Sequence, residues 1–154
     1  MHVVAIVLTL LAALLHGYIF VLESLRFDRP ATWKIFGVRG AQEAAIARPW
    51  AFNQGFYNLF LGVGAAIGGV LNALSNAGTS QAGWGRVLSV YCTAFMLAAA
   101  LVLVGSDRSK ARAAATQGTP PALAPLALPA PSRPPPPPAG VRPRRRSDVL
   151  AATV

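Results

Sequence analysis

The sequence predicts an all-α transmembrane helical bundle, and its composition and charge pattern both point to this fold class. Hydrophobic residues make up 54% of the 154 residues and charged residues only 12%, whereas about 25% of a typical soluble chain is charged. Three stretches, 3–22, 52–74 and 87–104, contain no Asp, Glu, Lys or Arg. Each is close to the roughly twenty residues that a helix needs to cross a hydrocarbon core of about 30 Å. We therefore expect three firm membrane spans.

The composition changes near residue 120. Eleven of the thirteen prolines lie between Pro120 and Pro143, and every aromatic residue lies at or before Phe95. The unbroken run Pro134–Pro138 favours an extended polyproline II conformation, because the proline ring fixes φ and removes the backbone donor. A segment without aromatic side chains has little with which to build a core. The sequence thus predicts a helical bundle over residues 1–130 and a disordered Pro/Arg-rich tail over residues 131–154.

A fourth span is the open question of the fold. Residues 113–130 are uncharged but contain four prolines, and each proline inside a helix costs about 3 kcal/mol. A fourth crossing would also carry the arginines of 142–146 across the membrane. The proline content alone therefore predicts three spans, with at most a Pro-interrupted fourth that is short, kinked or incomplete.

The distribution of basic residues predicts how the chain faces. The segment between the first and second spans holds five Lys or Arg residues, while the segment between the second and third holds only Arg86. Cytoplasmic loops carry the excess of basic residues in membrane proteins. We expect a multi-pass protein of the cytoplasmic (inner) membrane, with its N-terminus outside and its first loop in the cytoplasm.

A few polar side chains lie within the predicted spans, where they are costly and face the bundle interior. His16 and Glu23 are two helical turns apart and share a face. On the next span Asn53 lies one turn from Tyr57, and Gln54 one turn from Asn58. Because the two spans are consecutive and antiparallel, these groups can meet in the cytoplasmic half of the bundle. The predicted intramembrane polar cluster comprises His16, Glu23, Asn53, Gln54, Tyr57 and Asn58.

Two interpretations of this cluster remain open. Amide and imidazole side chains on membrane helices often hydrogen-bond a neighbouring helix, for roughly 0.6–2 kcal/mol each. The alternative is a ligand or proton site, because ionisable residues inside a membrane are often functional. The glycines of the same span, Gly62, Gly64 and Gly68, allow close helix packing. They serve either packing within the chain, which we favour, or a homo-oligomer interface.

Other chemistry has no pattern in the sequence. The two histidines and the lone Cys92 form no set with zinc spacing, and no glycine-rich phosphate loop or nucleophile motif is present. The basic tail lacks the interleaved aromatics of a nucleic-acid reader. We expect no enzyme activity, no cofactor, no metal and no nucleic-acid partner, but a binding or interaction bundle that contacts membrane lipid. The alternative is a small proton-coupled transporter-like module or an accessory subunit.

Several segments together resemble one bacterial family of small integral membrane proteins. These are His16-Gly17-Tyr18-Ile19, Glu23, Phe36-Gly37 and the run Asn53–Leu61. The family is catalogued as domain of unknown function 1304, and the resemblance covers residues 2–128. It implies a four-helix membrane bundle with no established activity, so no catalytic residue is implied. Residues 117–123 are similar to the start of the family's fourth helix, although the prolines that follow depart from its pattern.

Overall fold

The computed structural model describes residues 2–128, and over this range the chain is helical with no strand. Helix α1 covers His2–Phe20 and continues as a π-helix, η1, over Val21–Leu25. A short helix α2, Pro30–Phe36, precedes two long helices, α3 over Ala41–Leu74 and α4 over Ser80–Ser106. A 3-10 turn η2, Arg108–Lys110, leads into α5, Ala111–Leu126. The predicted tail, residues 131–154, lies outside the described residues.

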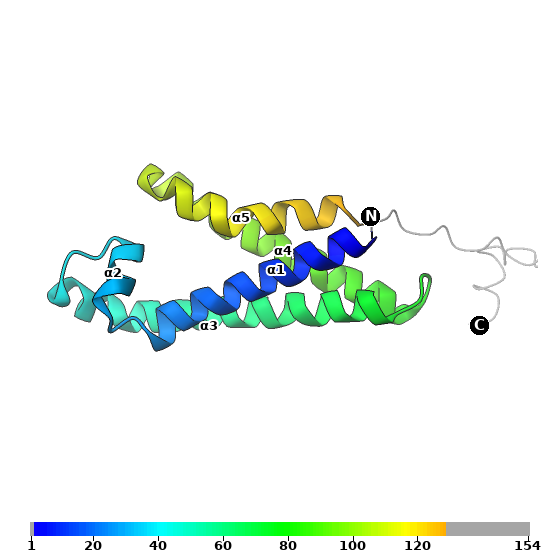
Figure 1. Cartoon of the computed structure of the whole chain (residues 1–154), viewed down its shortest axis with the longest axis horizontal. Helices are drawn as coiled ribbons and strands as arrows, with labels where there is room; N and C mark the ends of the chain where they lie inside the picture. Colours follow the sequence, from blue (N-terminus) through cyan, green and yellow to red (C-terminus); the bar gives the residue numbers. More distant parts are fainter. Residues whose placement is uncertain (1, 129–154) are drawn as a thin grey trace, which may run out of the picture.

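The four longer helices lie side by side as an elongated bundle (Figure 1). Helix α3 packs against α1 and α4, and α5 packs against α4 and α1. We call the end that holds α2, η2 and the start of α3 the loop end, and the opposite end, where α1 begins, the terminal end. Three helices are long and apolar enough to cross a membrane: His2–Leu25, Ala41–Leu74 and Ser80–Ser106. The predicted all-α bundle with three long apolar spans is confirmed.

Helix α5 departs from the expectation based on proline. Pro120, Pro121 and Pro125 all lie inside this helix, which runs on to Leu126 without a break. Its small buried residues, among them Gly118 and Ala124, face the bundle, where a Cβ on Gly118 would meet the side chain of Ala100. In membrane helices, tertiary contacts compensate for the donors that prolines lack. The prolines therefore do not interrupt the fourth helix, although it is short, at 16 residues.

The bundle places its small residues inside and its large apolar residues outside. The buried residues of the helices include many glycines, alanines, serines and threonines, and the larger ones are exceptions such as Met96 and His16. By contrast, Leu14, Phe60 and Val102 are exposed by 72%, 64% and 70%. This distribution would aggregate in water, but it is typical of helices surrounded by lipid, where apolar side chains need no burial. The fold is thus that of a membrane bundle.

Glycines set the distance between α3 and its neighbours. A Cβ on Gly62 would lie 3.0 Å from the Ala13 carbonyl oxygen of α1. A Cβ on Gly68 would lie 2.7 Å from the Ser89 backbone nitrogen of α4, and one on Gly64 would lie 2.6 Å from the Cys92 sulfur. The three predicted packing glycines therefore all serve contacts within the chain.

The loop end is closed by a contact between segments far apart in sequence. The Lys110 ammonium donates a 2.8 Å hydrogen bond to the Phe36 carbonyl oxygen at the end of α2. Gly37, the residue that follows, has φ of 76° and caps α2 in the left-handed conformation. A Cβ at Gly37 would also collide with the Lys110 ammonium. Glycine at this position thus serves both the turn and the contact.

We predict that Gly68→Ala destabilises the bundle by about 1–3 kcal/mol, because the new methyl group would overlap backbone atoms of α4 that cannot move aside. The matched control is Gly17→Ala, whose Cβ would meet no atom within 4 Å and which should be neutral or slightly stabilising. Thermal unfolding in detergent, followed by circular dichroism, measures both. Equal stability of the two variants would contradict this account of the α3–α4 contact.

Candidate functional site

The predicted polar cluster is centred on one hydrogen bond between α3 and η1. The Asn58 amide donates to Glu23 Oε2 at 2.8 Å and to the Gln54 backbone oxygen at 3.2 Å. Asn58 can reach Glu23 because it lies on the inward face of α3, one turn from the buried glycines Gly55 and Gly62. The structure therefore joins Glu23 and Asn58 directly and includes Gln54 through its backbone.

The other predicted members lie elsewhere. Asn53 is exposed, and Tyr57 is exposed by 58%. Both are turned away from the Gly55–Asn58–Gly62 face, since successive residues of a helix are rotated by about 100°. The Gln54 side chain is exposed as well. The Asn53 and Tyr57 side chains thus lie on another face of α3, and within residues 2–128 no hydrogen bond joins Tyr57 to His16 or Asn58.

His16 is buried, with 2% of its surface exposed, but its contact lies within its own helix. Its Nδ1 lies 2.9 Å from the Ala12 carbonyl oxygen. Since a carbonyl can only accept, Nδ1 carries the proton of this bond. The His16 Cβ also lies against the position that a Cβ on Gly62 would occupy, at 3.7 Å. His16 therefore packs at the α1–α3 contact, and no hydrogen bond joins it to Glu23 within residues 2–128.

The segment that carries Glu23 is the π-helix η1, which packs against α3. Single π-turns occur frequently at functional sites. The Ser24 hydroxyl donates to the Phe52 carbonyl oxygen at 2.8 Å, and a Cβ on Gly55 would overlap Ser24 Oγ. Gly55 thus lets η1 lie directly on α3, which fixes the height at which Glu23 meets Asn58.

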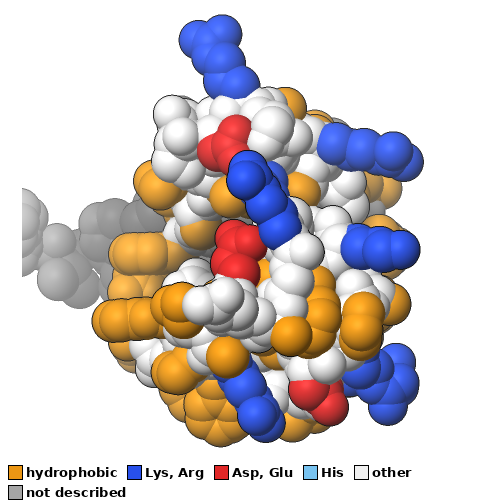
Figure 2. All heavy atoms as spheres, turned by 90° about the vertical axis from the view of Figure 1, so that its left-hand side faces the viewer, with side chains coloured by type: hydrophobic (Ala, Val, Ile, Leu, Met, Phe, Trp, Pro, Cys, Tyr) orange, Lys and Arg blue, Asp and Glu red, His pale blue; other side chains and the backbone are white. Residues whose placement is uncertain are grey.

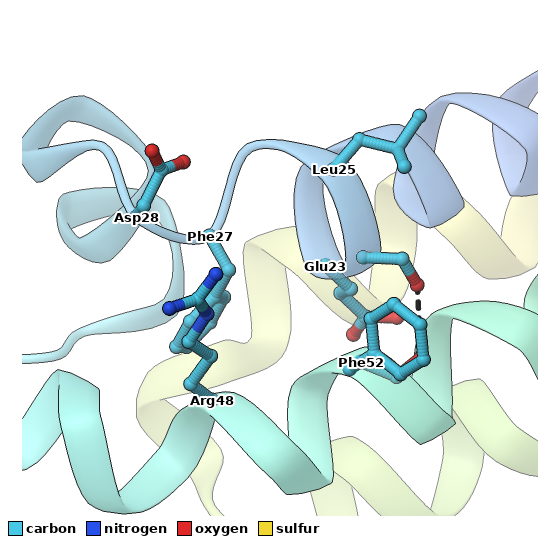
Figure 3. A pocket seen from close by; sticks show the side chains of 7 residues that line it. Glu23, Leu25, Phe27, Asp28, Arg48 and Phe52 are labelled. Carbon is cyan, nitrogen blue, oxygen red and sulfur yellow. Dashed lines mark hydrogen bonds between the residues drawn. The ribbon is translucent and has the colours of Figure 1, made fainter.

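A cavity of about 160 Å³ opens beside Glu23 at the loop end (Figure 3). A single water needs about 10–15 Å³ of such space, so the cavity has room for a small polar group. We call it the loop-end pocket, and seven residues line it: Glu23, Ser24, Leu25, Phe27, Asp28, Arg48 and Phe52. Glu23 is half-buried, while Asp28 and Arg48 are exposed at the rim.

Two features hold the walls of the loop-end pocket. The Trp33 indole N–H donates to the Phe27 carbonyl oxygen, and the rings of Phe27 and Phe36 lie 5.9 Å apart. Helix α2 therefore holds the Phe27 wall, while α3 supplies Phe52 and Arg48. Figure 2 views the bundle from the loop end and shows Lys and Arg side chains projecting around it, with Asp and Glu between them.

Sequence reasoning missed Ser24, Asp28, Arg48 and Phe52 as site residues. It placed Arg48 in a loop, whereas α3 begins at Ala41 and continues through Pro49. The signal that could have found the longer helix is the alanine-rich run after Gly40 with Glu43 in its first turn. Asp28 has no such signal, because it lies in the turn between η1 and α2.

Comparison with known proteins gives a family. Residues 10–128 match the family described as "Protein of unknown function (DUF1304)". The chain belongs to this family. The match confirms the resemblance found in the sequence, and it covers α1 from Leu10 through the whole of α5. No curated protein and no solved structure gives a significant match. This member of the DUF1304 family is a small helical protein with three apolar helices long enough to span a membrane.

We predict that Asn58→Leu lowers stability by about 1–3 kcal/mol, because it leaves the half-buried Glu23 carboxylate without its donor. The double variant Glu23→Leu/Asn58→Leu should recover most of this loss, since removing both partners of a hydrogen bond can be nearly neutral. Asn53→Leu, on the exposed face, is the matched control. The measurement is unfolding in detergent micelles, and strictly additive losses in the double variant would exclude the predicted coupling.

Proposed function

We propose that the protein is a multi-pass protein of the cytoplasmic membrane, with the loop end in the cytoplasm and the terminal end outside. The charge pattern supports this orientation. The loop end carries eight described basic residues on its connecting segments and flanking helix ends, whereas the connection between α3 and α4 has only Arg86 nearby. The eight are Arg26, Arg29, Lys34, Arg39, Arg48, Arg108, Lys110 and Arg112. Retention of basic segments in the cytoplasm gives this asymmetry.

The positions of two tryptophans support the same arrangement. Trp50 and Trp84 are exposed by 76% and 66%. Trp84 precedes Gly85, which packs against Asn72 of α3, and Asn72 is 22 positions from Trp50. That is roughly 33 Å of helix, close to the hydrocarbon thickness of about 30 Å. Tryptophan is enriched at both membrane–water interfaces, so Trp50 marks the loop-end interface and Trp84 the opposite one.

We extend the proposal to α5 as a fourth helix within the membrane layer. It packs along α4 and α1, and its last residues lie near the start of α1 (Figure 1). At about 24 Å it is shorter than a full crossing. Because α5 runs from the loop end toward the terminal end, we expect residue 128 to lie on the same side of the membrane as the N-terminus.

Single-cysteine labelling tests this topology in a Cys92→Ser background. In intact cells a membrane-impermeant maleimide should label Asn76→Cys and Leu128→Cys, while Arg29→Cys reacts only after the cells are opened. The reverse pattern for Asn76 and Arg29 would overturn the orientation. Labelling of Leu128→Cys only after opening would leave the orientation standing but refute the fourth crossing.

We further propose that the protein binds a small charged molecule in the loop-end pocket, a binding rather than a catalytic role. The observation that carries this is a half-buried carboxylate, Glu23, held by Asn58 at the side of a cavity that opens at the bundle end. The exposed Trp50 supports a position of this cavity at the membrane–water interface, on the side that we propose to be cytoplasmic. The alternative, a proton relay through His16 and Glu23, has less support, because the hydrogen bonds of these two residues lead to Ala12 and Asn58.

We predict that at least one small charged solute stabilises the protein through this pocket. The probes are inorganic phosphate, ethanolamine and glycine at millimolar concentration, and the readout is the unfolding temperature in detergent. A ligand well above its Kd that adds about 1 kcal/mol should raise this temperature by about 3–6 °C.

The shift should persist in Arg29→Leu, which removes the same charge at the same end from a residue outside the pocket lining. It should vanish in Arg48→Leu for phosphate and in Glu23→Gln for ethanolamine. If no probe, phosphoethanolamine included, shifts the wild type more than it shifts Glu23→Gln or Arg48→Leu, binding in this pocket is refuted.

A further inference from the structure

The loop-end pocket is lined by acidic and basic side chains that form no ion pair with one another. Glu23 and Asp28 are acidic and Arg48 is basic, and all three line the same cavity (Figure 3). Within residues 2–128, no ion pair within 4.0 Å and no side-chain hydrogen bond engages Asp28 or Arg48. The two rim charges are therefore both available to a ligand.

The depth of the charges gives the pocket a direction. Glu23 is half-buried and held by Asn58, whereas Arg48 is exposed on α3 at the opening. A carboxylate has four lone-pair sites, and Asn58 occupies one of those on Glu23. A donor group that enters the pocket thus meets an oriented acceptor at the inner side and a guanidinium at the rim.

The charges on the lining limit which ligand can bind. Phe27 and Phe52 add some apolar wall, but the pocket presents mainly polar surface. An anion alone would be attracted by Arg48 but repelled by Glu23 and Asp28. A cation alone would leave Arg48 without a partner. A ligand with an ammonium and an anionic group a few bonds apart satisfies both ends.

We propose that the loop-end pocket binds a zwitterion that joins a primary ammonium to a phosphate or carboxylate, with the ammonium at Glu23 and the anionic group at Arg48. A primary ammonium has three N–H donors for Glu23, whereas a quaternary ammonium has none. This inference rests on the proposed binding function and names its ligand class. The same chemistry occurs in a free amino-phosphate and in the headgroup of an ethanolamine phospholipid, both of which can reach an interfacial pocket.

The first experiment compares four probes by isothermal titration with delipidated protein in detergent. Phosphoethanolamine should bind at least tenfold more tightly than ethanolamine, inorganic phosphate or phosphocholine. Glu23→Gln, which keeps an acceptor for Asn58, should remove most of the advantage over phosphate, and Arg48→Leu most of the advantage over ethanolamine. Arg29→Leu should bind like the wild type. Unchanged helix content by circular dichroism confirms that each variant is folded.

The outcomes separate this inference from the proposed function. If ethanolamine or phosphate alone binds as tightly as phosphoethanolamine, the zwitterion assignment is overturned while a pocket for charged molecules stands. If phosphocholine binds as tightly, the proposed contact of a primary ammonium with Glu23 is overturned. If no probe distinguishes the wild type from Glu23→Gln and Arg48→Leu, both proposals fail.

A second experiment identifies the source of the ligand. The protein is placed in nanodiscs of ethanolamine or choline phospholipid, each mixed with the same fraction of anionic phospholipid, and is then extracted for native mass spectrometry. A lipid ligand predicts one retained ethanolamine phospholipid per chain, lost in Glu23→Gln and kept in Arg29→Leu. A soluble ligand predicts no retained lipid and equal phosphoethanolamine binding in both nanodiscs. Retention of choline lipid by the wild type but not by Glu23→Gln would overturn the requirement for a primary ammonium.

Discussion

The structure depends on the close approach of α3 to both of its neighbours. Lipid tails are as apolar as leucine, so the hydrophobic effect does not draw membrane helices together, and van der Waals packing has to do so. Gly62 gives α1 access to the backbone of α3, and Gly68 does the same for α4. Because these contacts fix the separation of the helices, they also fix which side chains meet at the loop end. The contact of Gly55 with Ser24 is the last of this series, and it lies directly beside the pocket.

The polar residues of the bundle serve two different purposes. Thr9, His16 and Thr93 hydrogen-bond carbonyl oxygens of their own helices, four residues earlier. Such bonds let a polar side chain lie in an apolar interior without needing a partner on another helix. Glu23 and Asn58 bond across two helices, as Asn72 and Ser89 do between α3 and α4, but of these two pairs only Glu23 and Asn58 do so beside the loop-end pocket. The adjacent cavity is why this pair, rather than the buried histidine, carries the functional proposal.

The candidate site was only partly predictable from the sequence. Helical spacing predicted that Glu23 shares a face with His16, seven residues earlier, and that Asn58 shares a face with Gln54, four residues earlier. Such relations depend only on the helix itself, so the sequence could indicate that Glu23 and Asn58 face each other. The same spacing could not separate Asn58 from Tyr57, because which face of α3 turns inward is decided by its contacts with α1. Arg48 lines the pocket because α3 begins at Ala41, well before Pro49. Asp28 lines it because of the turn between η1 and α2. Neither feature follows from hydropathy or charge.

The sequence by itself determined that this is an all-α chain with three long apolar helices. A hydrocarbon layer imposes a length and a composition on each span, and both are local properties that can be read along the chain. The tertiary structure alone decided that α5 stays helical through its prolines, that the glycines of α3 pack within the chain, and that opposite charges from η1, the following turn and α3 line one cavity. These outcomes depend on contacts between segments distant in sequence, and only the folded bundle brings those segments together.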